Sequence, residues 1–256
     1  MPSCKPATHA RAFALLRGAL LSIIVTATGS SGAASCQAIS GAQVPQVVEL
    51  YTSEGCSSCP PADRWLTTLK DRTDVLAAAF HVDYWDGLGW ADRFASPRHT
   101  QRQRDTMALS GARFAYTPQV LVNGRDWRRW PDLPQRPSPA TVQVRLVREQ
   151  PDGPVTTAVI EPLATTRTTP PRLALWWALV EDAHVTPVRR GENAGATLHH
   201  DRVVRAYGTV PAWQGAQRVS IPAVPDADTA HPRHLLAVVT DAASGAPVQA
   251  VQLACP

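Results

Sequence analysis

Residues Glu49–Pro61 read ELYTSEGCSSCPP, and this segment decides the predicted fold of the chain. The β-forming run Val47–Tyr51 leads into a turn, and a Cys-x-x-Cys pair stands where the next helix should begin. Cys56 and Cys59 can close a small disulfide ring at this spacing. The partial positive charge of a helix N-terminus favours the thiolate, which is the reactive form of cysteine. The segment therefore predicts dithiol chemistry, with Cys56 as the nucleophile and Cys59 as the resolving cysteine.

The sequence around this segment alternates between strand and helix patterns. The expected elements are a helix Pro61–Arg72, a strand Val75–Val82, a helix Arg98–Leu109 capped by Ser96 and stopped at Gly111, a strand Gln119–Val122 with an Asn-Gly turn after it, and a helix Ala140–Gln150. Strands that alternate with helices indicate an α/β layer fold. We therefore expect an α/β domain with a central mixed sheet flanked by helices over residues 36–150.

The sequence pattern changes from Val155 onward, where short β-rich runs alternate with turns and no strong helix pattern occurs. Such spacing is typical of an antiparallel sandwich. We therefore expect an all-β, sandwich-like domain over residues 151–256.

The first 35 residues are expected to be a secretory signal peptide rather than part of the fold. A basic head containing Lys5, Arg11 and Arg17 precedes the short apolar run Ala19–Val25, and small residues follow. A retained membrane anchor is the alternative, but the apolar run falls short of the roughly 20 residues that span a bilayer. The leader predicts a periplasmic or secreted protein.

Removal of this leader leaves 22 of the 25 basic residues against 21 acidic ones, a net charge of +1. The basic pI then says little about partners, and no basic stripe argues for nucleic acid. The sequence has no phosphate-cradling glycine loop and predicts no cofactor. Ser53 lacks a Gly-x-Ser-x-Gly context, so a hydrolase has no support.

The cysteine count also suits an exported protein. Cleavage of the leader removes one of five cysteines, and an even number in an oxidising compartment favours disulfides. If Cys56 pairs with Cys59, then Cys36 and Cys255 remain at the two ends of the chain, and chain ends often lie close together. We expect a Cys36–Cys255 disulfide worth roughly 4–5 kcal/mol in the chain-entropy description. The alternative is a lipid anchor at Cys36, because Ala34-Ser35-Cys36 is close to a lipoprotein signal ending.

With these residues in view, the first half resembles the thioredoxin superfamily in the order strand, Cys-x-x-Cys, helix, strand, helix, and Thr117-Pro118 before a further strand. In that superfamily a cis-proline packs beside the dithiol, and its neighbour pairs with the substrate backbone. The resemblance implies a cis Pro118 at the catalytic site and a substrate contact from Thr117. We expect Tyr116 and Trp85 to contribute to the same surface, with protein thiols or disulfides as partners.

The chain departs from ordinary thioredoxins beside the dithiol. The position of their buried aspartate holds Leu50, and Glu49 lies one residue away, on the opposite face of the strand. Pro60 follows the second cysteine, and a proline disfavours the helical region for the residue before it. We therefore expect Cys59 to lie at or before the start of the helix.

A closer resemblance links the chain to a bacterial family of secreted proteins known mainly as a domain of unknown function. The segments that carry it are Glu49–Asp63, Phe80–Trp90, Phe94–Pro97, Tyr116–Gly124 and Arg190–Ala194. That family pairs a thioredoxin-like domain with a β-rich one, so the likeness implies fold and export more firmly than a reaction. The predicted function is that of an exported thiol–disulfide oxidoreductase-like protein, with the direction of electron flow open.

Two alternatives remain open at this point. In the first, the Cys56–Cys59 disulfide is structural and the aromatic loop Asp83–Trp90 belongs to a non-catalytic binding module. In the second, the two thiolates join His81 or His99 in a copper-binding, chaperone-like protein. The sequence predicts no metal site, because it has no second Cys pair and no His-x-His spacing.

Overall fold

The structure is a computed structural model that describes residues 1, 3, 36–134, 138–150, 153–164, 171–223 and 230–254. Apart from residues 1 and 3, the expected signal peptide lies outside the described residues. Within those ranges, no helix is both long and apolar enough to cross a membrane.

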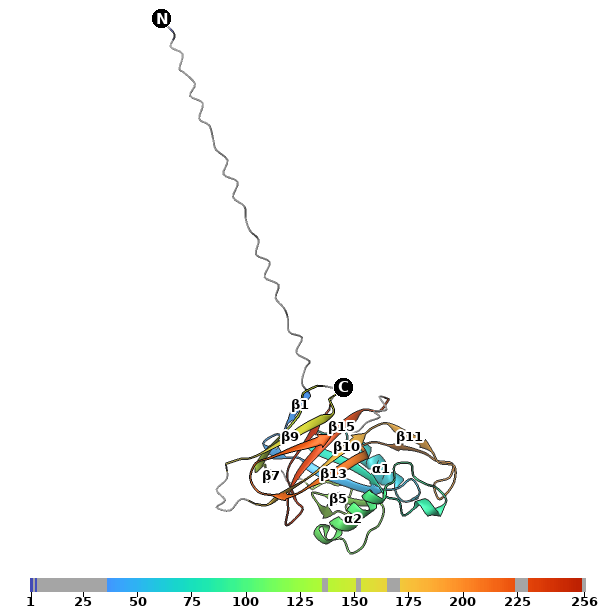
Figure 1. Ribbon diagram of the computed structural model, residues 1–256. Coiled ribbons are helices and arrows are strands. Elements are labelled where there is room, and N and C mark those ends of the chain that lie inside the picture. Colours follow the sequence, from blue (N-terminus) through green and yellow to red (C-terminus); the bar gives the residue numbers. More distant parts are fainter. Residues whose placement is uncertain are drawn as a thin grey trace. The chain divides into compact units, whose positions relative to one another are not determined.

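A sheet of eight strands runs through the molecule (Figure 1). Its strands in spatial order are β16 (Pro247–Leu253), β15 (Arg233–Asp241), β10 (Leu173–Glu181), β13 (Val203–Trp213), β4 (Val75–His81), β3 (Gln46–Thr52), β5 (Gln119–Val122) and β6 (Arg125–Asp126). β3 and β4 are parallel, whereas β5 is antiparallel to β3. β13 meets β4 through the pair Val203 and Ala79. Strands from the two halves of the chain therefore belong to one sheet.

A second sheet packs against one end of the first. Its strands in spatial order are β1 (Cys36–Ile39), β8 (Val142–Arg148), β9 (Val155–Pro162) and β14 (Gln217–Pro222). The core between the sheets includes Val142, Val144, Leu146, Leu173, Leu175 and Leu235. Two short ribbons complete the described strands: β2 (Gln43–Val44) with β7 (Ser138–Pro139), and β11 (His184–Pro187) with β12 (Thr197–His200).

Two α-helices accompany the strands within the described residues. α1 (Pro60–Thr67) buries Trp65 and Leu66 against the β3 face that carries Leu50. α2 (Pro97–Ser110) begins as predicted, because the Ser96 hydroxyl accepts a hydrogen bond from Arg98 N at 3.2 Å. It ends at Gly111, whose φ of 82° lies in the left-handed region. A short 3₁₀ helix, η1 (Asp86–Leu88), lies within the aromatic loop.

The predicted fold class is wrong. The described residues form sixteen strands and two α-helices, so the chain is mostly β rather than a thioredoxin-like α/β domain with flanking helices and a separate sandwich. The strands β3–β6 are one end of the eight-stranded sheet, and β13 from the second half continues it. The boundary expected at residue 150 stays a prediction, although strands on its two sides share a sheet.

The helix expected over Ala140–Gln150 is also wrong, because this segment contains β8. Burial alternates along the strand, with Val142 and Val144 buried and Gln143 and Arg145 exposed. This period of two places the apolar side chains on one face of a sheet, which is typical of a half-buried strand. The alternation outweighs the helix-forming residues in the segment.

Cys36 opens β1 and lies opposite Arg148 of β8. Its Sγ is 3.6 Å from the carbonyl oxygen of Ala254, so the end of β16 lies beside it. Cys255 lies outside the described residues. The Cys36–Cys255 disulfide and the lipid anchor at Cys36 therefore both stay predictions.

Candidate functional site

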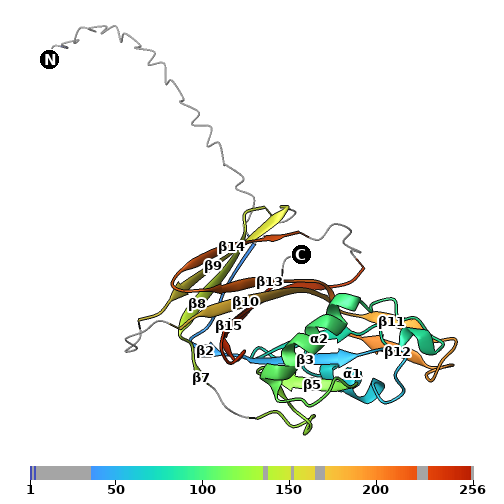
Figure 2. The same ribbon diagram turned by 60° about the horizontal axis from the view of Figure 1, so that its bottom comes forward.

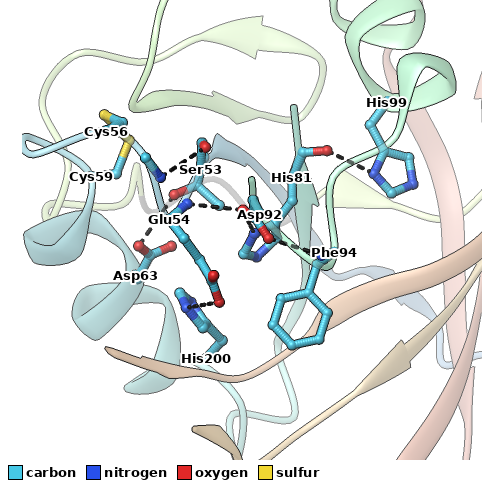
Figure 3. Close-up of polar contacts among 12 residues, drawn as sticks. Ser53, Glu54, Cys56, Cys59, Asp63, His81, Asp92, Phe94, His99 and His200 are labelled. Carbon is cyan, nitrogen blue, oxygen red and sulfur yellow. Dashed lines mark hydrogen bonds and ion pairs between the residues drawn. A yellow bond between two sulfur atoms is a disulfide. The ribbon is translucent and has the colours of Figure 1, made fainter. Parts of the chain in front are cut away.

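The Cys56–Cys59 pair forms a disulfide between β3 and α1, with the two Cα atoms 5.5 Å apart (Figure 3). Cys59 is the N-cap residue of α1, and Pro60 and Pro61 occupy its first turn. Cys59 keeps helical angles, with φ −78° and ψ −36°, but it precedes the first helical residue as expected. Both cysteines are fully buried at 0% exposure, whereas Ser57 and Ser58 between them are exposed.

Backbone hydrogen bonds hold this loop. Cys56 N donates to Ser53 O at 3.2 Å, and Cys59 N donates to Cys56 O at 3.2 Å. Gly55 allows the aromatic loop to approach closely, since a Cβ there would lie 3.1 Å from Cβ of Trp85. A larger residue at position 55 would push Trp85 away from the disulfide loop.

Of the residues predicted to contact the substrate, Thr117 and Trp85 bond to each other, whereas Tyr116 bonds to a different part of the protein. The Thr117–Pro118 peptide bond is cis. Trp85 joins this segment to the disulfide loop, because its Nε1 donates to Thr117 Oγ1 at 2.8 Å while its Cβ packs on Gly55. The Tyr116 hydroxyl is engaged elsewhere, since it donates to Asp126 Oδ1 at 2.7 Å. The catalytic role of Pro118 and the substrate contacts stay predictions.

Residues 188–196, which connect β11 to β12 and are called the capping loop below, cover the disulfide loop. Glu192 Oε2 accepts a hydrogen bond from Ser57 N at 3.0 Å. Asn193 Nδ2 donates to Glu54 O at 2.8 Å and to Cys56 O at 3.0 Å. Hydrogen bonds from the side chain and backbone of Ser57 hold the pKa of Glu192 below its ordinary value. The capping loop is therefore tied to the main chain around Cys56.

The capping loop also packs closely on the aromatic loop. A Cβ on Gly191 would lie 3.1 Å from the Trp90 Cβ, and a Cβ on Gly89 would lie 3.3 Å from the Gly191 Cα. Both glycines have positive φ, 76° for Gly191 and 108° for Gly89. A side chain at either position would crowd the facing loop, so the two glycines allow this close approach.

A cluster of buried ionisable side chains lies next to the disulfide (Figure 3). His81 Nδ1 and Asp92 Oδ2 form a 2.6 Å ion pair with both side chains at 0% exposure. Glu54 accepts a hydrogen bond from Trp90 Nε1 at 2.8 Å, and its other oxygen lies 3.5 Å from His200 Nε2. The cluster therefore connects β4, the aromatic loop and β12 beneath the disulfide loop.

The charges of this cluster are set by burial and pairing together. Burial alone would raise the pKa of Asp92, but the charge and hydrogen bond of His81 outweigh it and lower the pKa to about 2. Burial would lower the pKa of His81, yet Asp92 raises it above its ordinary value. Asp63 lies one helical turn after Cys59, and burial raises the pKa of its carboxyl. The site thus holds a buried ion pair and, beside it, a carboxyl whose pKa is raised by burial.

The cysteines and histidines are not brought together as a metal site. The His81 ring is engaged with Asp92, and His99 Nδ1 lies 3.0 Å from the backbone oxygen of His81. Figure 3 shows His99 on the far side of His81 from the disulfide. In the part of the chain that the structure describes, no group of three or more His, Cys, Asp or Glu side chains could hold a metal ion.

Glu49 lies on the opposite face of β3 from Leu50, as the alternation of the strand predicts. Its carboxylate accepts from Arg102 Nη2 of α2 at 2.8 Å and from the Tyr51 hydroxyl at 3.2 Å. Glu49 therefore belongs to a buried ion pair with α2, away from the α1 face that carries the dithiol.

Comparison with known protein families identifies the family of this chain. Residues 47–240 match the family described as protein of unknown function (DUF1223). The chain belongs to the DUF1223 family. No curated protein was found to match it.

Two solved structures resemble this DUF1223 protein. Protein AGR_C_4864 from Agrobacterium tumefaciens is 27% identical, with a TM-score of 0.60 over 83% of this chain and 95% of that chain. HBP35 of Porphyromonas gingivalis is 17% identical, with a TM-score of 0.55 over 83% of this chain and 76% of that chain. The second similarity shows the fold alone.

The local sequence pattern does not predict the buried cluster of Glu54, Asp92 and His200, nor the capping-loop residues Glu192 and Asn193. Glu192 and Asn193 lie more than 130 positions from the two cysteines, and their segment has the pattern of a charged hairpin tip. The antiparallel pairing of β11 with β12 confirms the hairpin. The one usable signal is that Arg190–Ala194 is among the segments that carry the likeness to the family.

Proposed function

We propose that this DUF1223 protein carries out thiol–disulfide exchange with a partner protein through the Cys56–Cys59 pair. The observation that carries the proposal is the disulfide itself, which stands at a strand-to-helix junction with Cys59 as the N-cap residue of α1. The positive end of the helix favours a thiolate in this place. The Thr117–Pro118 segment, which Trp85 connects to Gly55, lends further support.

The exchange proceeds in two balanced steps. A thiolate of the partner attacks Sγ of Cys56, the bond between Cys56 and Cys59 breaks, and Cys59 leaves as a thiolate that takes up a proton. A second thiolate of the partner then attacks the partner's sulfur in the mixed disulfide and releases Cys56. Two electrons pass from the partner to the Cys56–Cys59 pair, and the reverse steps reduce a partner disulfide. The direction in the cell depends on the reduction potential.

A second candidate function is a binding module that keeps an inert Cys56–Cys59 disulfide. The observation that favours it is the complete burial of both cysteines, because structural disulfides are shielded whereas reactive cysteines are partially exposed. The two candidates differ in whether Cys56 forms a mixed disulfide.

Trapping of that intermediate tests the proposal. The Cys59→Ser variant cannot resolve a mixed disulfide, so we expect it to accumulate a covalent adduct between Cys56 and a peptide disulfide, visible by mass spectrometry. The Cys56→Ser variant is the matched control and should form no such adduct at Cys59. An absence of adduct in Cys59→Ser, or full exchange by a folded Cys56→Ser protein, overturns the proposed function.

A further inference from the structure

Both sulfur atoms are closed off in the structure, and this raises the question of how a partner reaches them. Cys56 and Cys59 are at 0% exposure, although the loop between them is exposed. Exchange requires a thiolate to contact a sulfur atom directly. Some part of the molecule must therefore move before the partner reacts.

The capping loop contacts the segment around the dithiol through three hydrogen bonds from Glu192 and Asn193, and all three end on main-chain groups. The Glu192 carboxylate accepts the hydrogen bond of the Ser57 N–H, as a backbone carbonyl group of a partner could. The Asn193 amide donates to the carbonyl groups of Glu54 and Cys56, as backbone N–H groups of a partner could. A carbonyl and N–H groups of an extended polypeptide would satisfy the same three groups.

Most of the capping loop is exposed, so it can move without uncovering a large apolar surface. It lies at the tip of the β11–β12 ribbon, which forms its own two-stranded sheet beside α1 (Figure 2). Glu192 is exposed, and Gly191 and Gly195 have positive φ at either side of the contact residues. Segments with these features open more readily than a buried sheet.

We infer that the capping loop is a built-in competitor for the partner, and that the partner is an extended polypeptide segment that carries the reacting cysteine. The partner displaces Glu192 and Asn193 and replaces their hydrogen bonds to Ser57, Glu54 and Cys56. The inference rests on the proposed function, because it names the partner chemistry of the same dithiol. Small thiols, which cannot replace these bonds, are poor partners.

The first test measures access to the disulfide without relying on exchange activity. The folded, oxidised protein is treated with a water-soluble phosphine, which reduces a disulfide to two thiols as it takes up oxygen from water. The new thiols are then alkylated and mapped by mass spectrometry. Asn193→Ala removes two hydrogen bonds, so we expect the Cys56–Cys59 bond to be reduced about tenfold faster. Asn193→Asp keeps the size of the side chain but not its donors, and should accelerate the reduction as well.

Arg189→Ala is the matched control, since it changes an exposed residue of the same loop. We expect it to be reduced at the wild-type rate, and circular dichroism confirms that each variant is folded. Equal reduction rates in wild type, Asn193→Ala and Asn193→Asp would refute the capping role.

The second test identifies the partner chemistry. A nine-residue peptide with a central cysteine is compared with the same peptide N-methylated on the residues next to the cysteine, and with glutathione. We expect the unmodified peptide to form the mixed disulfide about threefold faster or more, because the methylated peptide lacks backbone donors. Equal rates for the two peptides would refute a polypeptide partner. If Cys59→Ser traps no adduct while the phosphine rates still differ, the proposed function fails and the capping role stands.

Discussion

His81 and Asp92 show how single residues set the electrostatics beside the dithiol. The two side chains are fully buried and 2.6 Å apart, so each charge depends on the other. The pKa of Asp92 is lowered to about 2, and a lowered carboxyl pKa adds stability above the ordinary pKa that is lost as the pH falls. The pKa of His81 is raised, so its contribution is complete at low pH and is lost as the pH rises through the raised value. The pair is therefore most stabilising from about pH 4 to about pH 6.5.

Asp92→Asn tests this account. We expect the free energy of unfolding to fall by about 2 kcal/mol at pH 6, since the pKa of Asp92 lies almost two units below the ordinary value. The difference from wild type should shrink as the pH falls from 4 towards 2. Urea unfolding at a series of pH values measures it, with the exposed Asp71→Asn as control. A difference that stays constant with pH would contradict the ion pair.

At the level of secondary-structure elements, local sequence patterns predict best the helices and strands whose ends are marked by capping or turn residues. Ser96 and Gly111 bound α2 as the sequence indicates, and the β-formers of β3 and β5 lie where the pattern places them. β8 lies where a helix is expected, although Val142, Val144 and Leu146 alternate with polar residues in the period of two that is typical of a strand. Cys56 and Cys59 are found at the predicted junction, since strand and helix flank them closely in the sequence.

Gly111→Ala tests the helix end. Gly111 adopts φ 82° at the C-cap of α2, a conformation that strains any residue with a Cβ, whereas no atom lies within 4 Å of the added carbon. We expect the variant to lose about 1 kcal/mol of stability from backbone strain alone. Gly87→Ala, where the added carbon also meets open space but φ is not positive, is the matched control and should be close to neutral. Equal effects of the two substitutions in urea unfolding would contradict the role of φ.

At the scale of the whole molecule, β13 decides the architecture. It pairs with β10 and reaches β4, and so joins the two halves into one sheet. Asp201, just before β13, reinforces this junction by pairing with Lys70 and accepting from Thr67 Oγ1 at 2.8 Å. Pairings between residues more than 100 positions apart leave no mark on local periodicity, which is why the sequence does not predict that β4 and β13 share a sheet. The contacts between the capping loop and the disulfide loop are not predicted from the sequence for the same reason.

The shared sheet predicts cooperative unfolding. Because β4 and β13 belong to one sheet, we expect a protein of residues 36–256 to unfold in a single transition, with coincident midpoints by far-UV circular dichroism and tryptophan fluorescence. Hydrogen exchange provides a second measurement, in which the amides of β3 and β10 should show the same opening free energy. Two separated transitions would indicate that the halves are independent folding units.

The most direct test of the central claim is an equilibrium redox titration of the purified protein, with the state of each cysteine mapped by mass spectrometry. Thiol–disulfide exchange requires a Cys56–Cys59 potential between roughly −120 and −270 mV, the range of known exchange catalysts. We predict a value in that range, and its position would indicate whether the protein oxidises or reduces its partner. A potential below about −300 mV would mark the pair as a structural disulfide and contradict the proposed function.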